Sequence, residues 1–146
     1  MSFDEFLRSR RIRRESVSRD EVHRALELAD RDLQVAEGLL DEDRRDWGFA
    51  IGYNAVLQAS RAYMFSQGYR PASAESHKNT LAFMRIALGQ EHRTLVTYFD
   101  RMRRKRHQAV YDQVGLISER EARDLLARAC EFVALVRELL AEAVDE

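Results

Sequence analysis

The sequence predicts an all-α protein, an antiparallel bundle of four to five helices, and three observations lead to that prediction. Hydrophobic residues make up 45% and charged residues 34% of the 146 positions, with one proline and six glycines, a balance typical of compact helical domains. Apolar residues recur at spacings of three and four, and two Ser-x-x-Glu sequences have the form of capping boxes. A chain of this length forms one domain that buries a single core without disulfides or metal.

Residues 1–17 are predicted as a basic N-terminal arm and residues 18–146 as the helical bundle. The arm is rich in arginine, and its apolar residues are too scattered to define a helix. The bundle begins at the capping box Ser18–Glu21, and the apolar residues that follow at helical spacing predict a first helix over about 19–41. A cluster of acidic and basic residues over 41–46 then makes the turn.

The second helix is expected to begin near Trp47 and to end at Gly68, a residue typical of helix C-termini. Its apolar residues cover more than one face, so this helix belongs at the centre of the bundle. A loop over 69–73, which contains Pro71, follows, and the third helix is predicted over about 76–88.

The fourth helix is predicted over about 91–110 and is followed by a break over 112–116. The second capping box, Ser118–Glu121, opens the last helix, whose apolar side continues to Leu140. Short connections between consecutive helices predict antiparallel neighbours.

Several kinds of chemistry are not indicated by the sequence. Cys130 is the only cysteine, so neither an intramolecular disulfide nor a cysteine-based zinc site can form. The four histidines include no pair at i, i+4, and no glycine-rich phosphate loop occurs. We therefore expect no metal ion and no other cofactor. The N-terminus does not read as a signal peptide, and no apolar stretch is long enough to span a membrane, so we expect a soluble, cytoplasmic protein.

The run from Arg101 to Asp112 is the most informative stretch, because it places five cations in six positions of a predicted helix. Apolar residues approach it at Phe99 and Met102 and leave it at Ala109, and Arg106 occupies the position that this stripe would otherwise fill. A cation on a core-facing stripe must be paired or line a polar cleft, because burying it alone sacrifices its hydration.

Arg106 has two neighbours that suit phosphate or ribose chemistry. His107 lies about 100° round the helix, and Tyr111 lies one turn beyond His107. An arginine, an imidazole and a phenol together can bind phosphate and move protons. The candidate catalytic residues are Arg106, His107 and Tyr111, and the candidate RNA- or phosphate-binding residues are His77, Arg101, Arg103, Arg104 and Lys105.

Each candidate also has a purely structural interpretation. Basic runs on helices are usually solvated faces, and this run could instead pair with the acidic last helix of its own chain or of a dimer mate. His77, at the start of the third helix, either donates to phosphate or only caps and stacks. Tyr111 is either a site residue or part of the core. The aromatic residues of the second helix, Tyr53 included, are predicted as core, and Asn54 as a satisfied buried amide.

A set of short motifs occurs in a defined order over roughly residues 20–140. They are Tyr53-Asn54-Ala55, Ala62 and Gly68 in the central helix, Ser76-His77-Lys78, Arg104-Lys105-Arg106-His107 with Tyr111-Asp112, and Ser118-Glu119-Arg120-Glu121-Ala122. In this order and spacing they resemble the HEPN domain, a small all-helical prokaryotic family often encoded beside a minimal nucleotidyltransferase. The resemblance implies a homodimer in which two arginine-containing motifs face each other across a cleft. It also implies, for active members, a metal-independent ribonuclease in which an arginine and a histidine four to six residues later assist attack of a ribose 2′-hydroxyl on the adjacent phosphate.

The family motif fits this chain in two registers. Arg101 and His107, separated by five residues, satisfy the spacing. In the second register Arg106 is the motif arginine, His107 the polar residue after it, and Tyr111 stands where the catalytic histidine would be. We favour the second register because Arg106 occupies the core-facing stripe. A tyrosine of pKa near 10 is a poor proton shuttle at pH 7, so catalysis would fall to His107 or be absent.

Two functions therefore compete. One is an RNA-cleaving enzyme of a toxin–antitoxin or defence-type system, which acts without a metal ion. The other is a binding module without turnover, in which the same cluster holds RNA, a nucleotide or the acidic surface of a nucleotidyltransferase-type antitoxin. Affinity of such a module for RNA would fall steeply with salt.

Overall fold

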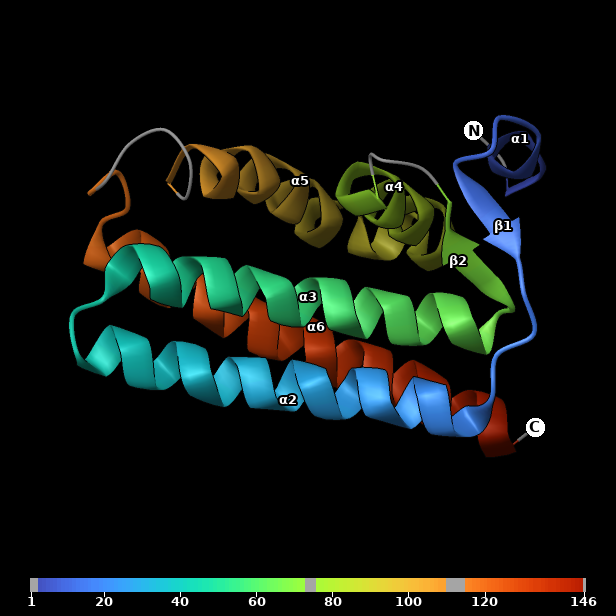
Figure 1. The fold of residues 1–146 in the computed structure, drawn as a ribbon, viewed down its shortest axis with the longest axis horizontal. Coiled ribbons are helices and arrows are strands. Elements are labelled where there is room, and N and C mark those ends of the chain that lie inside the picture. Colours follow the sequence, from blue (N-terminus) through green and yellow to red (C-terminus); the bar gives the residue numbers. More distant parts are fainter. Residues whose placement is uncertain (1–2, 73–75, 110–114, 146) are drawn as a thin grey trace.

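The computed structural model describes residues 3–72, 76–109 and 115–145 (Figure 1). The elements in chain order are α1 (Phe3–Arg8), β1 (Ile12–Arg14), α2 (Arg19–Asp41), α3 (Arg45–Ser66), β2 (Tyr69–Pro71), α4 (Ser76–Leu88), the short 3₁₀ helix η1 (Gln90–His92), α5 (Arg93–His107) and α6 (Glu119–Asp145). The described chain is an all-α bundle, as predicted, and α2, α4 and α6 begin within a residue of their predicted starts.

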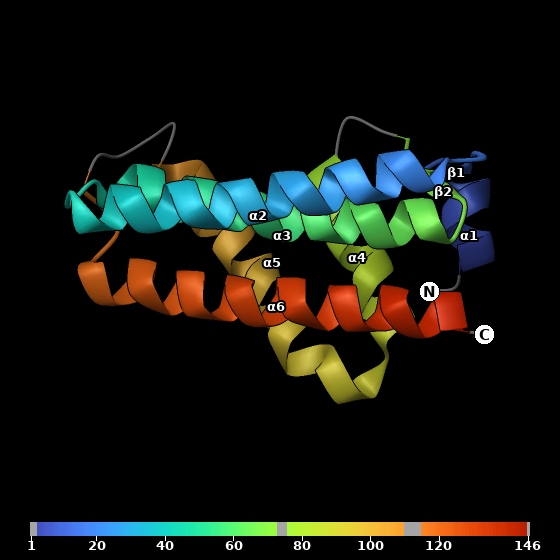
Figure 2. The ribbon, with the colours of Figure 1, turned by 90° about the horizontal axis from the view of Figure 1, so that it is seen from below.

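The helices form two layers around α3 (Figures 1 and 2). α2 and α3 make an antiparallel hairpin, and α6 packs against both while running in the direction of α3. The hairpin of α4 and α5 lies across the other side of α3, and its connection extends past α6 (Figure 2). α3 contacts four other helices, which agrees with its apolar residues on more than one face.

Small residues let α2 and α3 approach closely. A Cβ atom at Gly48 would lie 2.5 Å from a side-chain carbon of Leu40, so any larger residue at this point would force the Leu40 side chain to move. Large side chains fill the other interfaces of α3 and α6. The rings of Phe99 on α5 and Phe132 on α6 meet edge to face with centres 5.4 Å apart, and both residues are fully buried.

Both predicted capping boxes are confirmed. The Ser18 hydroxyl accepts a hydrogen bond from the backbone N–H of Glu21 at 3.3 Å. At the start of α6 the box is reciprocal: the Ser118 hydroxyl accepts from the Glu121 N–H at 3.1 Å, and the Glu121 carboxylate accepts from the Ser118 N–H at 3.3 Å.

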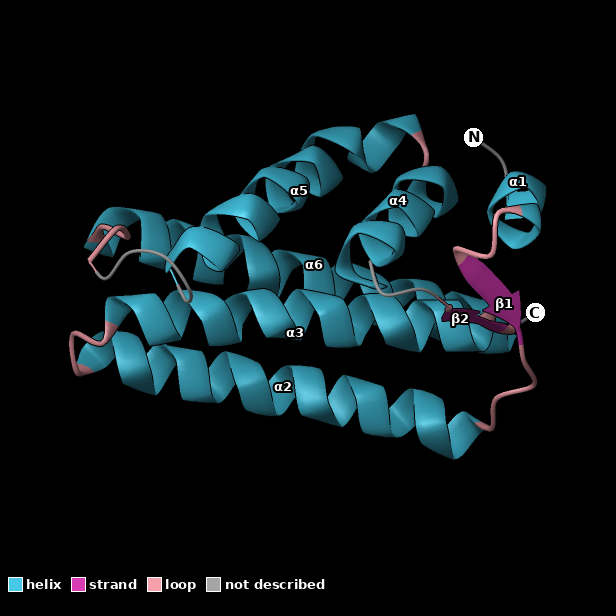
Figure 3. Cartoon of the chain, turned by 45° about the horizontal axis from the view of Figure 1, so that its top comes forward, coloured by secondary structure: helices cyan, strands magenta, loops and turns pink. Residues whose placement is uncertain are grey.

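The N-terminal segment differs from the predicted arm, because it is folded onto the bundle (Figure 3). Phe6 on α1 is only 2% exposed and Ile12 on β1 only 1%, and Phe3 stacks on Phe83 of α4 with ring centres 4.6 Å apart. β1 pairs antiparallel with β2, so part of the predicted loop at 69–73 is a strand. The large apolar side chains of this segment pack on the bundle, but their positions in the sequence show no sustained helical periodicity. A three-residue strand is also too short to show the alternation of apolar and polar residues that predicts a strand.

Two searches over the described part of the chain complete the description. None of its helices is long and apolar enough to cross a membrane. Within residues 3–72, 76–109 and 115–145, no group of three or more His, Cys, Asp and Glu side chains is placed to hold a metal ion.

Candidate functional site

Arg106 faces the centre of the bundle, as its position in the apolar stripe of α5 predicts. Its Nη2 atom donates a hydrogen bond to Oδ1 of Asn54 on α3 at 3.2 Å. Its guanidinium carbon lies 5.6 Å from the centre of the Tyr53 ring, within the range of a cation–π interaction. The side chain is half-buried, and two residues 52 or more positions earlier in the chain hold it.

Tyr53 and Arg106 each keep a buried polar atom without a hydrogen-bond partner among the described residues. These atoms are the Tyr53 hydroxyl oxygen and Arg106 Nε. An unmet buried polar atom destabilises a fold by about 1–3 kcal/mol, and native structures contain few of them. Burial raises the pKa of Tyr53 far above its ordinary value, although the positive charges of Arg103 and Arg106 oppose that rise. The phenol therefore keeps its proton at neutral pH and is available as a donor.

His77, in the first turn of α4, lies beside Tyr53. Its ring centre is 6.2 Å from that of Tyr53, and the side chain is half-buried. Burial lowers the pKa of His77 below its ordinary value, and the nearby charges of Arg106, Arg61 and Arg103 lower it further. The imidazole is thus neutral at pH 7, with one nitrogen able to accept a proton. We call Tyr53, Asn54, His77 and Arg106 the Arg106 site.

Among the other cations of the basic run, Arg103 also acts on the Arg106 site, because its charge influences Tyr53 and His77, whereas the rest are exposed or paired elsewhere. Arg103 pairs with Asp100 at 3.3 Å, and the exposed Arg104 reaches the same carboxylate at 4.0 Å. Lys105 pairs with Glu121 on α6, which is the intrachain arrangement proposed above as a structural alternative for the run. Arg101 is exposed, and its charge acts on Tyr98 one turn earlier.

Two predicted catalytic residues are not placed at the Arg106 site by the structure. His107 is the last residue of α5 and is exposed. Tyr111 lies outside the described residues, so the register that equates it with the family's histidine stays a prediction. The reactivity of His107 also stays a prediction.

Sequence reasoning missed Tyr53 and Asn54 as site residues. Tyr53 is core, as predicted, but its ring contacts the Arg106 guanidinium and its hydroxyl has no hydrogen-bond partner among the described residues. Asn54 is only half-buried, and its amide is satisfied by Arg106. The available signal was an asparagine next to a tyrosine in an otherwise apolar helix, and nothing in the sequence joined it to a cation on α5.

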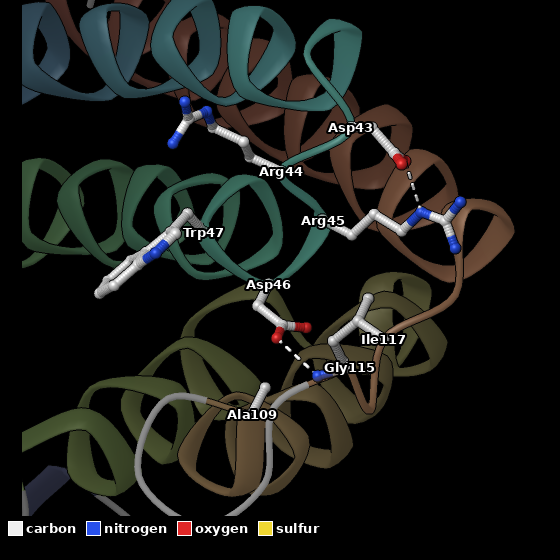
Figure 4. A pocket seen from close by; sticks show the side chains of 8 residues that line it. All are labelled: Asp43, Arg44, Arg45, Asp46, Trp47, Ala109, Gly115 and Ile117. Carbon is white, nitrogen blue, oxygen red and sulfur yellow. Dashed lines mark hydrogen bonds and ion pairs between the residues drawn. The ribbon is translucent and has the colours of Figure 1, made fainter.

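A separate cavity of about 510 Å³ lies at the turn between α2 and α3, close to the end of α5 (Figure 4). Its charged groups are largely paired within the chain: Arg45 contacts Asp43 at 2.8 Å, and Asp46 accepts a hydrogen bond from the N–H of Gly115 at 2.9 Å. These pairs make the cavity a poorer site for an anion than the Arg106 site.

The fold and the Arg106 site define a class: a helical-bundle protein in which a half-buried arginine and a neutral histidine both lie beside one buried tyrosine. Comparison with known protein families narrows this class. The family model of the HEPN domain matches residues 22–139, from the first turns of α2 to near the end of α6, and the chain belongs to this family. A search of curated proteins returned no match.

Proposed function

We propose that the protein binds RNA through a backbone phosphate at the Arg106 site and cleaves it there without a metal ion. The observation that carries the proposal is the unmet hydrogen-bonding capacity of Arg106 Nε and the Tyr53 hydroxyl, two buried donors within one contact of each other. Phosphate oxygens accept hydrogen bonds from donors of both kinds, and the guanidinium offsets their charge.

The same groups suit transfer of a phosphoryl group within RNA. The ribose 2′-hydroxyl attacks the adjacent phosphorus, the bond to the 5′-oxygen of the next nucleotide breaks, and a 2′,3′-cyclic phosphate and a 5′-hydroxyl result. A base takes the proton of the 2′-hydroxyl, and an acid protonates the leaving oxygen. The neutral imidazole of His77 is suited to be the base, His107 is the second imidazole available, and Arg106 stabilises the charge that develops on the phosphate.

The test is cleavage of RNA in the presence of a chelator, comparing Arg106→Ala with Arg104→Ala. Arg104 is a matched control because it lies on the same helix, with its side chain 72% exposed. We expect Arg106→Ala to lower kcat by roughly 10²–10³-fold, the loss typical of one charge-stabilising donor, and Arg104→Ala to change it little. Equal activity of the two variants would contradict the proposal.

The variants His77→Ala and His107→Ala test which of the two imidazoles acts as the base and which as the acid. The base should set the acid limb of the pH–rate profile, so its loss removes that limb, whereas loss of the acid changes the basic limb. Full activity in both variants would exclude both histidines from the chemistry.

Binding without turnover is the second candidate, and the placement of His107 favours it. His107 is exposed at the end of α5, whereas the His77 ring lies beside Tyr53 and the charge of Arg106 acts on it. In that case the Arg106 site holds RNA, a nucleotide or an acidic face of a nucleotidyltransferase-type antitoxin. The logarithm of the RNA-binding constant would then fall linearly with the logarithm of the salt concentration. Arg106→Ala would weaken RNA binding, and no cleavage product would form.

A further inference from the structure

A second positively charged site lies beside the Arg106 site, in a pocket of about 660 Å³ between α2, α3 and the β1–β2 pair. Four arginines and a single carboxylate are among the residues that line it. We call it the arginine pocket, and its polar lining includes Arg13, Arg24, Arg61, Arg70, Gln58 and Glu21.

The charges of the arginine pocket are only partly balanced within the chain. Arg70 pairs with Glu21 and Glu15, and Arg13 reaches Glu15 at 3.7 Å. For Arg24 and Arg61, no carboxylate of the described residues lies within ion-pair distance.

Arg61 is the most informative of the four arginines. Its side chain is half-buried, and burial lowers its pKa. A guanidinium partly removed from water without a counter-charge destabilises the fold, and an anionic ligand would relieve that penalty. The strand register reinforces the charge, because Arg13 and Arg70 are direct partners in the β1–β2 pair.

The arginine pocket and the Arg106 site are continuous along α3. Asn54, Gln58 and Arg61 are spaced i, i+4 and i+7, which places them on one face of the helix. His77 connects the two sites, since its imidazole is close enough to feel the charges of both Arg106 and Arg61. Seven residues of helix span about 10 Å, which is longer than the step between adjacent phosphates of one RNA strand, so the two sites would contact phosphates that are not adjacent.

We propose that the arginine pocket is a second phosphate subsite, which binds the backbone of the same RNA strand more than one nucleotide away from the phosphate at the Arg106 site. This inference rests on the proposed function, and it adds the class of substrate. A single strand of several nucleotides binds at both sites, whereas a dinucleotide binds only at the Arg106 site. Arg61 and Arg24 bind the strand, and Arg106 binds the reacting phosphate.

The experiment measures fluorescence anisotropy of a labelled RNA dinucleotide and a labelled single-stranded octanucleotide. Variants are Arg61→Gln, Arg106→Gln and Arg44→Gln, the last a control on the α2–α3 turn, whose arginine is exposed and outside the arginine pocket. We expect Arg61→Gln to weaken octanucleotide binding about tenfold, to reduce its salt slope by about one, and to leave dinucleotide binding unchanged. Arg106→Gln should weaken both, and Arg44→Gln neither.

The outcomes separate the two proposals. If Arg61→Gln matches Arg44→Gln on the octanucleotide while Arg106→Gln loses affinity, the second subsite is wrong and the proposed function stands. If Arg106→Gln matches wild type, or wild type binds neither RNA, the proposed function is wrong and the subsite falls with it. Equal weakening of both RNAs by Arg61→Gln also contradicts a separate subsite. Chemical denaturation checks the fold: Arg61→Gln should be at least as stable as wild type, because the substitution removes a half-buried charge.

Discussion

At the scale of single residues, the Arg106 site contains buried polar groups that lower the stability of the free protein and that a ligand could satisfy. Tyr53 is fully buried, yet its hydroxyl has no hydrogen-bond partner among the described residues. A phenylalanine would fill the same space without that unmet group. An arrangement that destabilises the free protein is expected where a ligand supplies the missing bond.

Tyr53→Phe should therefore raise the free energy of unfolding by about 1 kcal/mol while weakening RNA binding. Urea denaturation and anisotropy measure the two effects. Tyr98→Phe is the matched control, because the Tyr98 hydroxyl is hydrogen-bonded to Asp124 on α6 and its removal should lower stability. A loss of stability in Tyr53→Phe comparable to that of Tyr98→Phe would show that the Tyr53 hydroxyl is satisfied in solution.

His77 predicts a dependence of stability on pH. Its pKa in the fold is below the ordinary value, so between these two values the unfolded chain binds more protons and stability rises with pH. The contribution of the neutral imidazole is complete above about pH 7 and is lost as pH falls through the ordinary pKa of about 6.5. His77→Gln should flatten the decline of unfolding free energy between pH 7 and pH 5. An unchanged slope would mean that neither burial nor the charges of Arg106, Arg61 and Arg103 lower the pKa of His77.

At the scale of elements, the short N-terminal pieces α1 and β1 hold the arginine pocket in shape. β1 carries Arg13, and its pairing with β2 places Arg70 beside it. α1 anchors β1 through Phe6, which is buried in the common core. The N-terminal segment is thus part of the fold and of the proposed strand-binding surface.

Phe6→Ala should destabilise the protein by about 3–5 kcal/mol, the usual effect of deleting a buried aromatic side chain. Thermal or urea denaturation measures the loss. At temperatures where the variant stays folded, octanucleotide binding should weaken more than dinucleotide binding. A variant as stable as wild type would mean that residues 3–14 behave in solution as the arm that the sequence predicts.

The sequence predicts the long helices well because their signals are local. Capping boxes at Ser18 and Ser118 and the apolar periodicity of α2 and α6 need no knowledge of the rest of the chain. The inward position of Arg106 is predicted for the same reason. The contact of Arg106 with Asn54 and the β1–β2 pair join residues more than 50 positions apart, and a single sequence carries no local signal for such contacts.

At the scale of the whole molecule, the near-neutral net charge of −1 hides a strong local asymmetry. Arg61 on α3 and Arg24 on α2, which both line the arginine pocket, have no carboxylate partner among the described residues, while α6 has an acidic first turn. We therefore expect binding of an RNA strand to depend on the local electric field of these arginines rather than on the net charge of the protein. Binding should weaken steeply as salt screens that field.

At the same scale, we predict that the protein is a homodimer. The likeness to HEPN proteins implies a homodimer, so light scattering on the purified chain should give a mass of twice 17.1 kDa. If the dimer joins two Arg106 sites across a cleft, the two arginines repel each other, so dimerisation should strengthen as salt screens that repulsion. A monomer at all concentrations would contradict the prediction.

The close approach of α2 and α3 at Gly48 also bears on the position of the Arg106 site. Because Gly48 has no side chain, α3 lies close against α2 one and a half turns before Tyr53 and Asn54, two residues of α3 that contact Arg106 on α5. A methyl group at that position would meet the side chain of Leu40, which would have to move aside. The place that α3 takes beside α2, and with it the position of Tyr53 and Asn54, thus depends on the absence of one carbon atom at a glycine that takes no part in the Arg106 site.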